Sequence, residues 1–148
     1  MARTLKDAFY SANYRVGQGI YTRAVSQGDN SLTESNFVNY DTMANLVGDA
    51  SAMPEFAGSQ ICMEDAASNS VAMNKVSSSQ TAMDAVAGSQ TARDVIGFSG
   101  LAYDTIANSN MAIGKYAIGY TTESPSDYAD MDAVAASQTA MDAVAASQ

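Results

Sequence analysis

Apolar and polar positions repeat every ten residues along most of this chain. The repeat runs without an insertion from residue 51 to residue 120, and its clearest copy, residues 81–90, returns almost unchanged at residues 139–148. With blocks of ten aligned from residue 41, the second position is small in every copy, and the seventh is small from the second copy on. The third and sixth positions are mostly large and apolar, while the fourth and ninth are rich in turn-forming residues. The two small positions therefore lie five residues apart, and so do the two turn-forming positions.

Local propensity favours helix in the Ala- and Met-rich copies, but the period does not suit one continuous helix. Ten residues make about 2.8 helical turns, so the apolar face would rotate by roughly 80° from one copy to the next. Pro54 and the glycines at 97, 114 and 119 would also interrupt such a helix. The pattern therefore disfavours a continuous helix and leaves a broken one open.

The fold that this spacing favours is mainly β: a narrow β-solenoid-like array of ten-residue coils, preceded by a small mixed head. Each coil would contain two three-residue strands and two two-residue turns, and like residues would stack in ladders about 4.8 Å apart. The small second and seventh positions would point inward, between two closely spaced sheets. The alternative is a broken α-helical repeat or a helical trimeric shaft.

In the β arrangement the third and sixth positions form apolar stripes on the outside of the array. Stripes of this length exceed what soluble monomers usually expose, so we expect other copies of the chain to cover them in a trimer or filament. The opposite arrangement, with Met and Val in the core and the Ala positions outside, carries equal weight. The stripe residues are Met53, Met63, Met73, Met83, Val76, Val86 and Ile96.

Four segments follow from the pattern: an N-terminal docking head at 1–40, the decapeptide array at 41–120, a loop insertion at 121–128, and resumed repeats at 129–148. In the head, residues 4–14 have the spacing of a short amphipathic helix, and residues 16–20 are expected to form a turn. Residues 26–41 are expected to form a loop or short strands, anchored by Leu32, Phe37 and Val38. The resumed repeats end without a polar cap, so we expect another subunit to cover them or the array to continue.

Charge divides the chain into two parts. The net charge is -9; residues 1–28 hold four basic residues and one acidic residue, and residues 29–148 hold three basic residues and fifteen acidic ones. The acidic array argues against nucleic-acid binding, which needs clustered Lys and Arg. The basic, Tyr-rich head suits docking onto a protein partner. The candidate docking residues are Arg3, Lys6, Tyr10, Tyr14, Arg15, Tyr21 and Arg23.

The composition offers little chemistry. The chain has no histidine, and Cys62, its one cysteine, occupies a small-residue position, where a buried thiol is favoured over a reactive one. Asp84, Asp94 and Asp104 occur at equivalent positions, but solvated aspartates are favoured over a Ca²⁺ site because neighbouring copies lack a regular ligand pattern. We expect no enzyme, no cofactor and no metal. Neither a signal peptide nor a transmembrane stretch is evident, which predicts synthesis inside the cell.

Tandem copies of Ala-Met-Asp-Ala-Val-Ala-Ala-Ser-Gln-Thr, as in residues 130–148 and 82–91, resemble the decapeptide arrays of fibre-like tail proteins in large tailed bacteriophages. The resemblance implies a structural component of a virion fibre or tail appendage, made in the host cytoplasm, with a head that docks on other virion or assembly proteins and an oligomeric shaft. The alternative is a soluble extracellular module whose ladder face recognises a repetitive glycan or ice surface. Its candidate residues are Thr81, Thr91 and Thr139.

Overall fold

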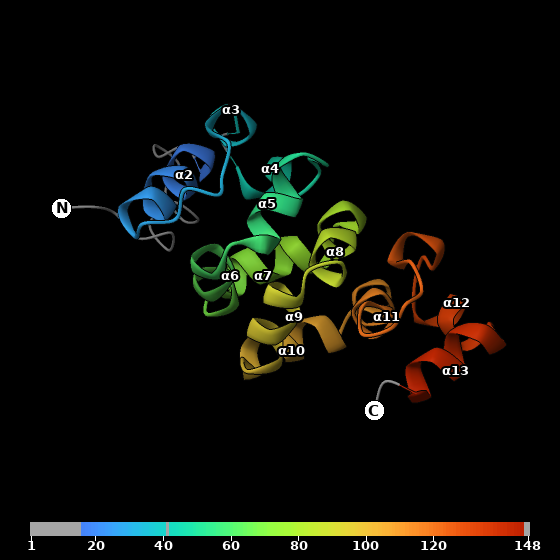
Figure 1. Ribbon diagram of the computed structural model, residues 1–148. Helices are drawn as coiled ribbons and strands as arrows, with labels where there is room; N and C mark the ends of the chain where they lie inside the picture. The colour runs from blue at the N-terminus through green and yellow to red at the C-terminus, as the bar shows by residue number, and fades with distance from the viewer. Residues whose placement is uncertain (1–15, 41, 147–148) are drawn as a thin grey trace.

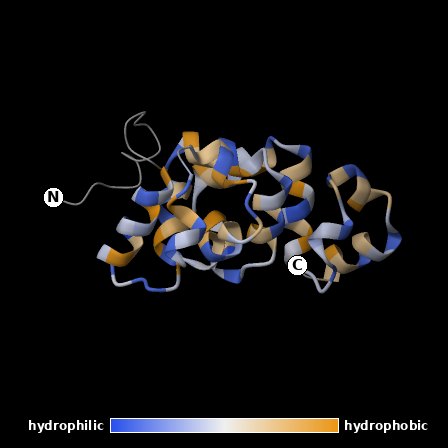
Figure 2. Ribbon diagram, turned by 90° about the horizontal axis from the view of Figure 1, so that it is seen from above, coloured by the Kyte–Doolittle hydropathy of each residue, from blue (hydrophilic) through white to orange (hydrophobic). Residues whose placement is uncertain are grey.

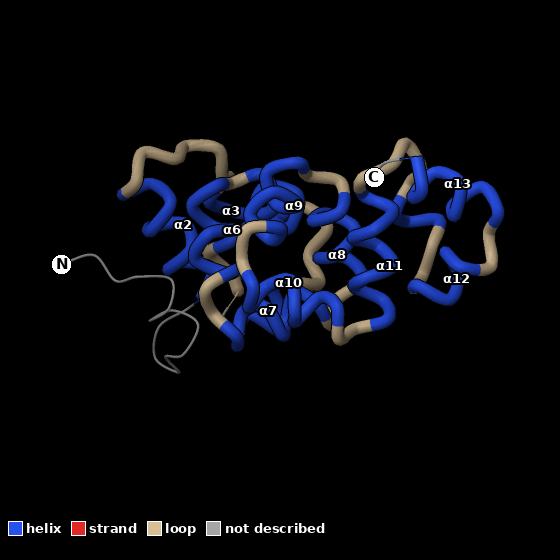
Figure 3. Tube along the Cα trace, turned by 90° about the horizontal axis from the view of Figure 1, so that it is seen from below, coloured by secondary structure: helices blue, strands red, loops and turns tan. Residues whose placement is uncertain are grey.

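The computed structural model describes residues 16–40 and 42–146, and all regular secondary structure within them is helical (Figures 1 and 3). The helices near the N-terminus are α2 (Val16–Ser26), α3 (Glu34–Phe37) and α4 (Met43–Leu46). The repeat forms α5 (Ala52–Gly58), α6 (Gln60–Ala67), α7 (Ser70–Ser77), α8 (Gln80–Ala87), α9 (Gln90–Gly97), α10 (Gly100–Ala107) and α11 (Asn110–Gly119). A 3-10 turn, η1 (Pro125–Asp127), then precedes α12 (Met131–Ala135) and α13 (Gln138–Ala146).

Each complete decad forms one short helix and a two-residue link. The helices α6 to α10 have eight residues each, and the residue at the ninth position of the preceding decad is their N-cap. In α9, for example, the Ser89 hydroxyl accepts a hydrogen bond from the backbone N–H of Ala92 at 3.2 Å. Such a cap contributes about 1 kcal/mol to helix stability. The ninth-position serines therefore restart a helix every ten residues.

The short helices stack as a superhelix with three helices in each turn. Each helix packs on the helix three places later: α5 on α8, α6 on α9, α7 on α10 and α8 on α11. Four of the capping serines also join successive turns, because the hydroxyl of each donates to a backbone carbonyl 32 residues earlier. These bonds run from Ser79 to Val47 (2.7 Å), Ser89 to Ala57 (2.8 Å), Ser99 to Ala67 (2.9 Å) and Ser109 to Ser77 (3.3 Å). We call this set the serine ladder.

In α5 to α8 the second, third, sixth and seventh positions of the decad face the core. On a helix these positions lie on one side, so a single face carries both the small and the large apolar residues. Figure 2 shows apolar and polar residues alternating along the short helices, as this arrangement requires. From Ala52 to Ala112 the small second-position residues are buried, as the sequence predicted, but they lie on helices.

The predicted β-solenoid-like array of ten-residue coils is wrong: the described residues are all-α and contain no strand. The argument against helix assumed an uninterrupted one, whose apolar face drifts around the axis. Here each link ends one helix and starts the next, so the face returns to the core in every copy. The fourth position, predicted as a turn, lies within the helices, whereas the ninth lies in the link.

The predicted outer stripes are also wrong, because their side chains lie inside the chain's own core. Packing of successive turns covers them, so no second copy is needed to remove them from water. All seven are fully buried: Met53, Met63, Met73, Met83, Val76, Val86 and Ile96.

The N-terminal helices cover the first turn of the superhelix. Leu32 and Phe37 are buried there, as predicted, and Val38 is half-buried. The turn predicted at residues 16–20 is instead the first part of α2, where Gly17 lies against the α3 backbone. A Cβ on Gly17 would stand 1.5 Å from the Phe37 carbonyl oxygen, so this glycine permits close packing of the two helices. The helix predicted at residues 4–14 lies outside the described residues.

At the other end, α11 differs from the preceding repeats and stops the stack. A Cβ on Gly114 would lie 2.3 Å from the backbone nitrogen of Met131, so this glycine admits the chain that follows the 121–128 loop. Lys115 is only 2% exposed, and its ammonium donates to Asp84 (2.6 Å) and to the carbonyls of Pro125 (3.1 Å) and Tyr128 (3.0 Å). Helix α12 consequently packs on α11 and not on α9 (Figure 1).

Candidate functional site

The stacking of turns ends on α9 and α10, and the positions that stacking covers elsewhere become accessible there. In α5 to α8 the third and seventh positions are all buried. In α10 both Tyr103 and Ala107 are exposed, and in α9 Arg93 is half-buried and Gly97 is exposed. We call this surface, together with the adjacent α13, the uncovered end.

An Arg–Tyr cluster lies on the uncovered end. The ring centroids of Tyr103 and Tyr116 are 6.0 Å apart, and those of Tyr116 and Tyr120 are 5.2 Å apart, both in edge-to-face geometry. The guanidinium of Arg93 lies 5.2 Å from the centroid of the Tyr120 ring, within cation–π range. The Tyr116 and Tyr120 hydroxyls are 2.8 Å apart, and each lies 3.3 Å from the Arg93 carbonyl. Burial, followed by the hydrogen bond to Tyr120, raises the pKa of Tyr116, so its hydroxyl stays protonated.

Arg93 takes the place of a missing member of the serine ladder. Continuing the ladder would require a side chain at position 119 to reach the Ala87 carbonyl, but Gly119 stands there and has no hydroxyl. A Cβ at 119 would be 2.5 Å from the Ala87 oxygen, so the backbone itself occupies that space. Arg93 Nη1 donates to the Ala87 carbonyl at 2.6 Å, whereas its buried Nε has no partner. No described carboxylate forms an ion pair with Arg93.

Two hollows adjoin these features. One, of about 370 Å³, lies between Arg93, Tyr120, Thr121 and the α13 residues Ala143 and Ala146, among others.

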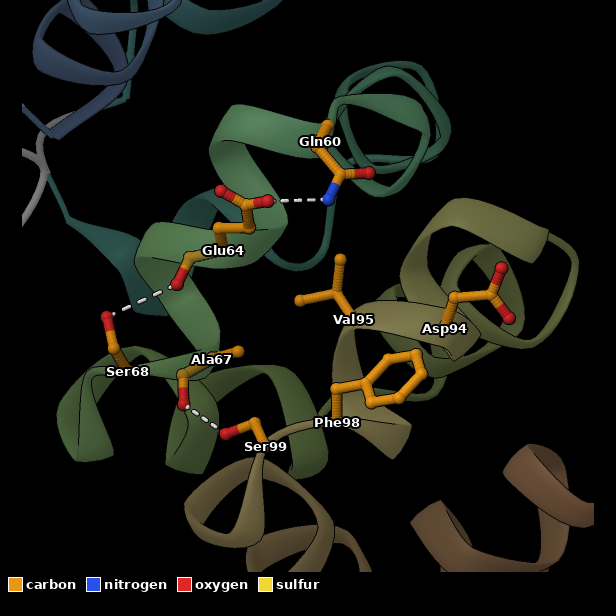
Figure 4. A pocket seen from close by; sticks show the side chains of 8 residues that line it. All are labelled: Gln60, Glu64, Ala67, Ser68, Asp94, Val95, Phe98 and Ser99. Atoms are coloured by element: carbon orange, nitrogen blue, oxygen red, sulfur yellow. Dashed lines mark hydrogen bonds between the residues drawn. The ribbon is translucent and has the colours of Figure 1, made fainter.

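The other hollow, of about 520 Å³, lies on the side of the superhelix between α6 and α9 (Figure 4). Phe98 stands at its edge with 93% of its surface exposed, at an eighth position that the other decads between residues 51 and 110 fill with Gly, Ser or Asn. Gln60, Glu64 and Asp94 supply polar groups around it. We call this hollow the Phe98 groove.

The predicted docking residues are not brought together on a described surface. Tyr21 is half-buried and packs against the core, and Arg23 Nε forms an ion pair with Asp65 at 3.0 Å. The remaining candidates lie outside the described residues: Arg3, Lys6, Tyr10, Tyr14 and Arg15. The described part of the head is thus attached to α6 by one of the charges proposed for an external partner.

Sequence reasoning missed both Phe98 and the Arg–Tyr cluster. A signal was present, because the third position changes from Met in five consecutive copies to Arg93, Tyr103 and Ile113. That change falls where stacking stops. It has a physical reason, since a position no longer covered by a following turn tolerates polar groups.

The described residues contain little reactive chemistry. No group of three or more His, Cys, Asp or Glu side chains in this part of the chain is arranged to hold a metal ion. Cys62 is fully buried, as predicted, and burial raises its pKa to about 12, so the thiol is protonated at neutral pH. Among the described helices, none is long and apolar enough to cross a membrane.

No family model matches the chain, and neither a curated protein nor a solved structure is significantly similar to it. The function must therefore be argued from the stack, its uncovered end and the Phe98 groove.

Proposed function

We propose that this chain is a structural component of an elongated, homo-oligomeric assembly, and that the assembly is a virion fibre or tail appendage. The superhelix serves as a rigid spacer, and the N-terminal head anchors it to other virion or assembly proteins. The observation that carries this proposal is the serine ladder. The ninth-position serine, the most regular polar residue of the repeat, caps a helix and also bonds to the preceding turn. Both interactions strengthen the stack.

The geometry suits a spacer because the stack can be lengthened in equal steps. Packed helices lie about 8–10 Å apart, so each turn of three decads adds roughly that length to the superhelix. Every decad contacts only its neighbours in sequence and the turns before and after it, as in other repeat proteins. Stiffness is expected along the axis, since caps, ladder bonds and buried methionines all join one turn to the next.

An enzymatic role has little support. The sequence contains no histidine, which removes the commonest general base, and the single thiol is buried and protonated. A bound cofactor is not part of the proposal.

The proposal is tested by measuring mass and shape in solution. Sedimentation velocity on the full chain, from low micromolar concentrations to about 1 mM, should reveal self-association at the upper end. A chain that remains strictly monomeric over that range would contradict the homo-oligomeric assembly.

A lengthened variant tests the spacer separately. Inserting a second copy of residues 60–89 directly after Ser89 would add one turn of three decads. Small-angle scattering should then show an increase of roughly 8–10 Å in the maximum dimension of the chain. The matched control inserts the same segment with five residues deleted, which places the serines out of register. We expect the control to unfold at lower temperature; equal stability of both insertions would argue against the ladder as the basis of the spacer.

The Phe98 groove favours a second candidate function, recognition of a glycan. An exposed aromatic ring beside amide and carboxylate groups offers a stacking surface together with hydrogen-bond partners for hydroxyls. The three threonines do not form a ladder, because Thr81 and Thr91 lie on α8 and α9, which are consecutive helices of one turn, and Thr139 lies on α13, outside the regular stack. A glycan array probed with the full chain and with Phe98→Ala tests this function: binding that is unchanged by the substitution would exclude the groove.

A further inference from the structure

The Phe98 groove lies between one pair of stacked helices, and equivalent pairs lie on the other sides of the superhelix. Helices α6 and α9 form the groove, while α5 with α8 and α7 with α10 are the equivalent pairs. The groove is lined, among others, by the fourth position of the first decad and the fourth, fifth and eighth positions of the second: Glu64, Asp94, Val95 and Phe98. In the α7–α10 pair the same positions are all polar: Asn74, Asp104, Thr105 and Asn108. In the α5–α8 pair they are Pro54, Asp84, Ala85 and Gly88. Of these three pairs, only the one at the Phe98 groove combines an aromatic ring with two carboxylates.

The end of α9 does not need the Phe98 side chain. Phe98 is the C-cap residue of that helix and acts through its backbone, whose N–H donates to the Asp94 carbonyl at 3.2 Å. Asn108 is the C-cap of α10 with similar backbone angles, φ -84° and ψ 0° against φ -95° and ψ 0° for Phe98. A ring that is 93% exposed also adds almost no buried apolar area. The fold therefore gives no reason for an aromatic residue at this position.

The two carboxylates of the groove are not neutralised within the described part of the chain. Glu64 and Asp94 occupy the same decad position on helices that pack on each other, and packed helices lie about 8–10 Å apart. That separation is close to the Debye length at physiological ionic strength, so their repulsion is only partly screened. Lys115 pairs with the equivalent Asp84 at 2.6 Å, whereas no described Lys or Arg forms an ion pair with Glu64 or Asp94. A cation in the groove would relieve this repulsion.

The side-chain donors of the groove already form hydrogen bonds within the chain. Gln60 Nε2 donates to Glu64 Oε1 at 2.6 Å, and the Ser68 hydroxyl donates to the Glu64 carbonyl at 3.2 Å (Figure 4). The Ser99 hydroxyl belongs to the serine ladder and donates to a backbone carbonyl at 2.9 Å. The Asp94 carboxylate accepts no hydrogen bond from a described residue. The groove therefore offers a ligand mainly acceptors, together with the face of an aromatic ring.

These properties match one protein side chain, that of arginine. Its guanidinium is positively charged, has five N–H donors and no acceptor, and is planar, so that it stacks on aromatic rings. The lysine ammonium also carries donors and charge, but it lacks the flat face. The hydroxyls of a neutral sugar both donate and accept, so they would meet acceptors for their donors but few donors for their acceptors.

We propose that the Phe98 groove binds an arginine side chain of a protein partner. The guanidinium stacks on the Phe98 ring and donates to the carboxylates of Asp94 and Glu64, which project from α9 and α6 in Figure 4. The volume of about 520 Å³ admits the side chain together with part of the adjoining peptide. This inference goes beyond the self-association proposed above, and it gives the groove an occupant other than a neutral glycan.

Fluorescence anisotropy with a labelled tetra-arginine peptide tests the proposal on the full chain at physiological ionic strength. Phe98→Asn removes the ring and introduces the residue that caps α10, and Asp94→Asn removes one carboxylate. Asp104→Asn is the matched control, because it removes a carboxylate at the same decad position in the pair that lacks the ring. All three variants should melt at the temperature of the wild type, since the substituted side chains are exposed.

We expect the ring and the nearby carboxylate to matter and the distant carboxylate not to. Phe98→Asn should weaken binding roughly two- to fivefold, as for loss of an exposed cation–π contact. Asp94→Asn should weaken it by up to about fivefold, as for loss of an exposed ion pair, and Asp104→Asn should leave it unchanged. Phe98→Tyr should restore binding, and tetra-lysine should bind the wild type more weakly than tetra-arginine does.

Four results would overturn the proposal. The first is no binding of tetra-arginine up to about 10 mM, and the second is unchanged binding in Phe98→Asn. Equal weakening by Asp94→Asn and Asp104→Asn would show attraction to the net charge of -9 alone. A neutral glycan that binds the wild type, fails to bind Phe98→Asn and is not displaced by tetra-arginine would assign the groove to the glycan.

Discussion

Replacing one serine of the ladder separates its two contributions to stability. In Ser89→Ala the helix α9 loses its cap, which costs about 1 kcal/mol. The same substitution removes the hydroxyl that donates to the Ala57 carbonyl at 2.8 Å, and a buried carbonyl without a partner costs about 1–3 kcal/mol. We therefore expect Ser89→Ala to lower the free energy of unfolding by roughly 2–4 kcal/mol, the sum of the two effects.

Ser89→Asn isolates one of these contributions. Asn69 occupies the equivalent position before α7 and caps that helix through Oδ1, which accepts from the Ala72 N–H at 3.1 Å. No hydrogen bond from its side chain to an earlier carbonyl is present in the described residues. Asparagine at 89 should therefore keep the cap and lose the link between turns, with a cost of about 1–3 kcal/mol.

Urea unfolding followed by far-ultraviolet circular dichroism measures both variants. The midpoint should fall for each while the slope m stays constant, since a changed slope would signal loss of two-state unfolding along the repeat. Ser78→Ala, at an exposed position, is the control and should stay within about 0.5 kcal/mol of the wild type. If Ser89→Asn is as stable as the wild type, the hydrogen bond to the Ala57 carbonyl adds nothing to stability and the reasoning is refuted. If Ser89→Ala is also as stable as the wild type, the N-cap of α9 contributes nothing either.

Three further substitutions or reactions follow from buried groups. Lys115→Met leaves Asp84 and two carbonyls without their donor, and we expect it to lower the free energy of unfolding in urea by about 2–4 kcal/mol. This loss is smaller than the usual cost of breaking a buried ion pair because Asp84 is partly exposed. A variant as stable as the wild type would contradict the role of Lys115 in attaching the loop. Gly17→Ala should destabilise by more than about 1 kcal/mol, since its Cβ meets the Phe37 carbonyl, and a melting temperature equal to the wild type would argue against close packing of α2 on α3. Cys62 should react with a thiol reagent at pH 8 only after unfolding, because burial raises its pKa to about 12; rapid labelling of the native chain would refute that environment.

The sequence alone was enough for the ten-residue period, the burial of the second-position residues and the environment of Cys62. These features depend on residue size at fixed spacing, which holds for strands and helices alike. Secondary structure could not be decided in the same way, because the rotation of an apolar face matters only for a helix that continues. Ser79, Ser89 and their equivalents look the same in sequence whether they form a β-turn or cap a helix.

The uncovered end was harder to predict for a different reason. Residues 129–148 repeat the array's sequence closely, so sequence alone places them in the same stack. The position of residues 129–146 in the structure is set by single residues in α11: Gly114 lets the later chain approach, Lys115 binds the loop, and Gly119 removes a member of the serine ladder. Each is an ordinary residue whose effect depends on what lies across from it in space.

The serine ladder also bears on how such a protein changes in evolution. Every ladder bond spans the same separation in sequence, so gain or loss of whole decads leaves the remaining bonds in register, whereas loss of one residue breaks the register of everything that follows. Near-identical segments that lie ten residues apart, such as 131–138 and 141–148, are the substrates on which unequal recombination acts at the gene level. The length of the protein is therefore open to heritable change in steps of one decad, without any new contact having to arise.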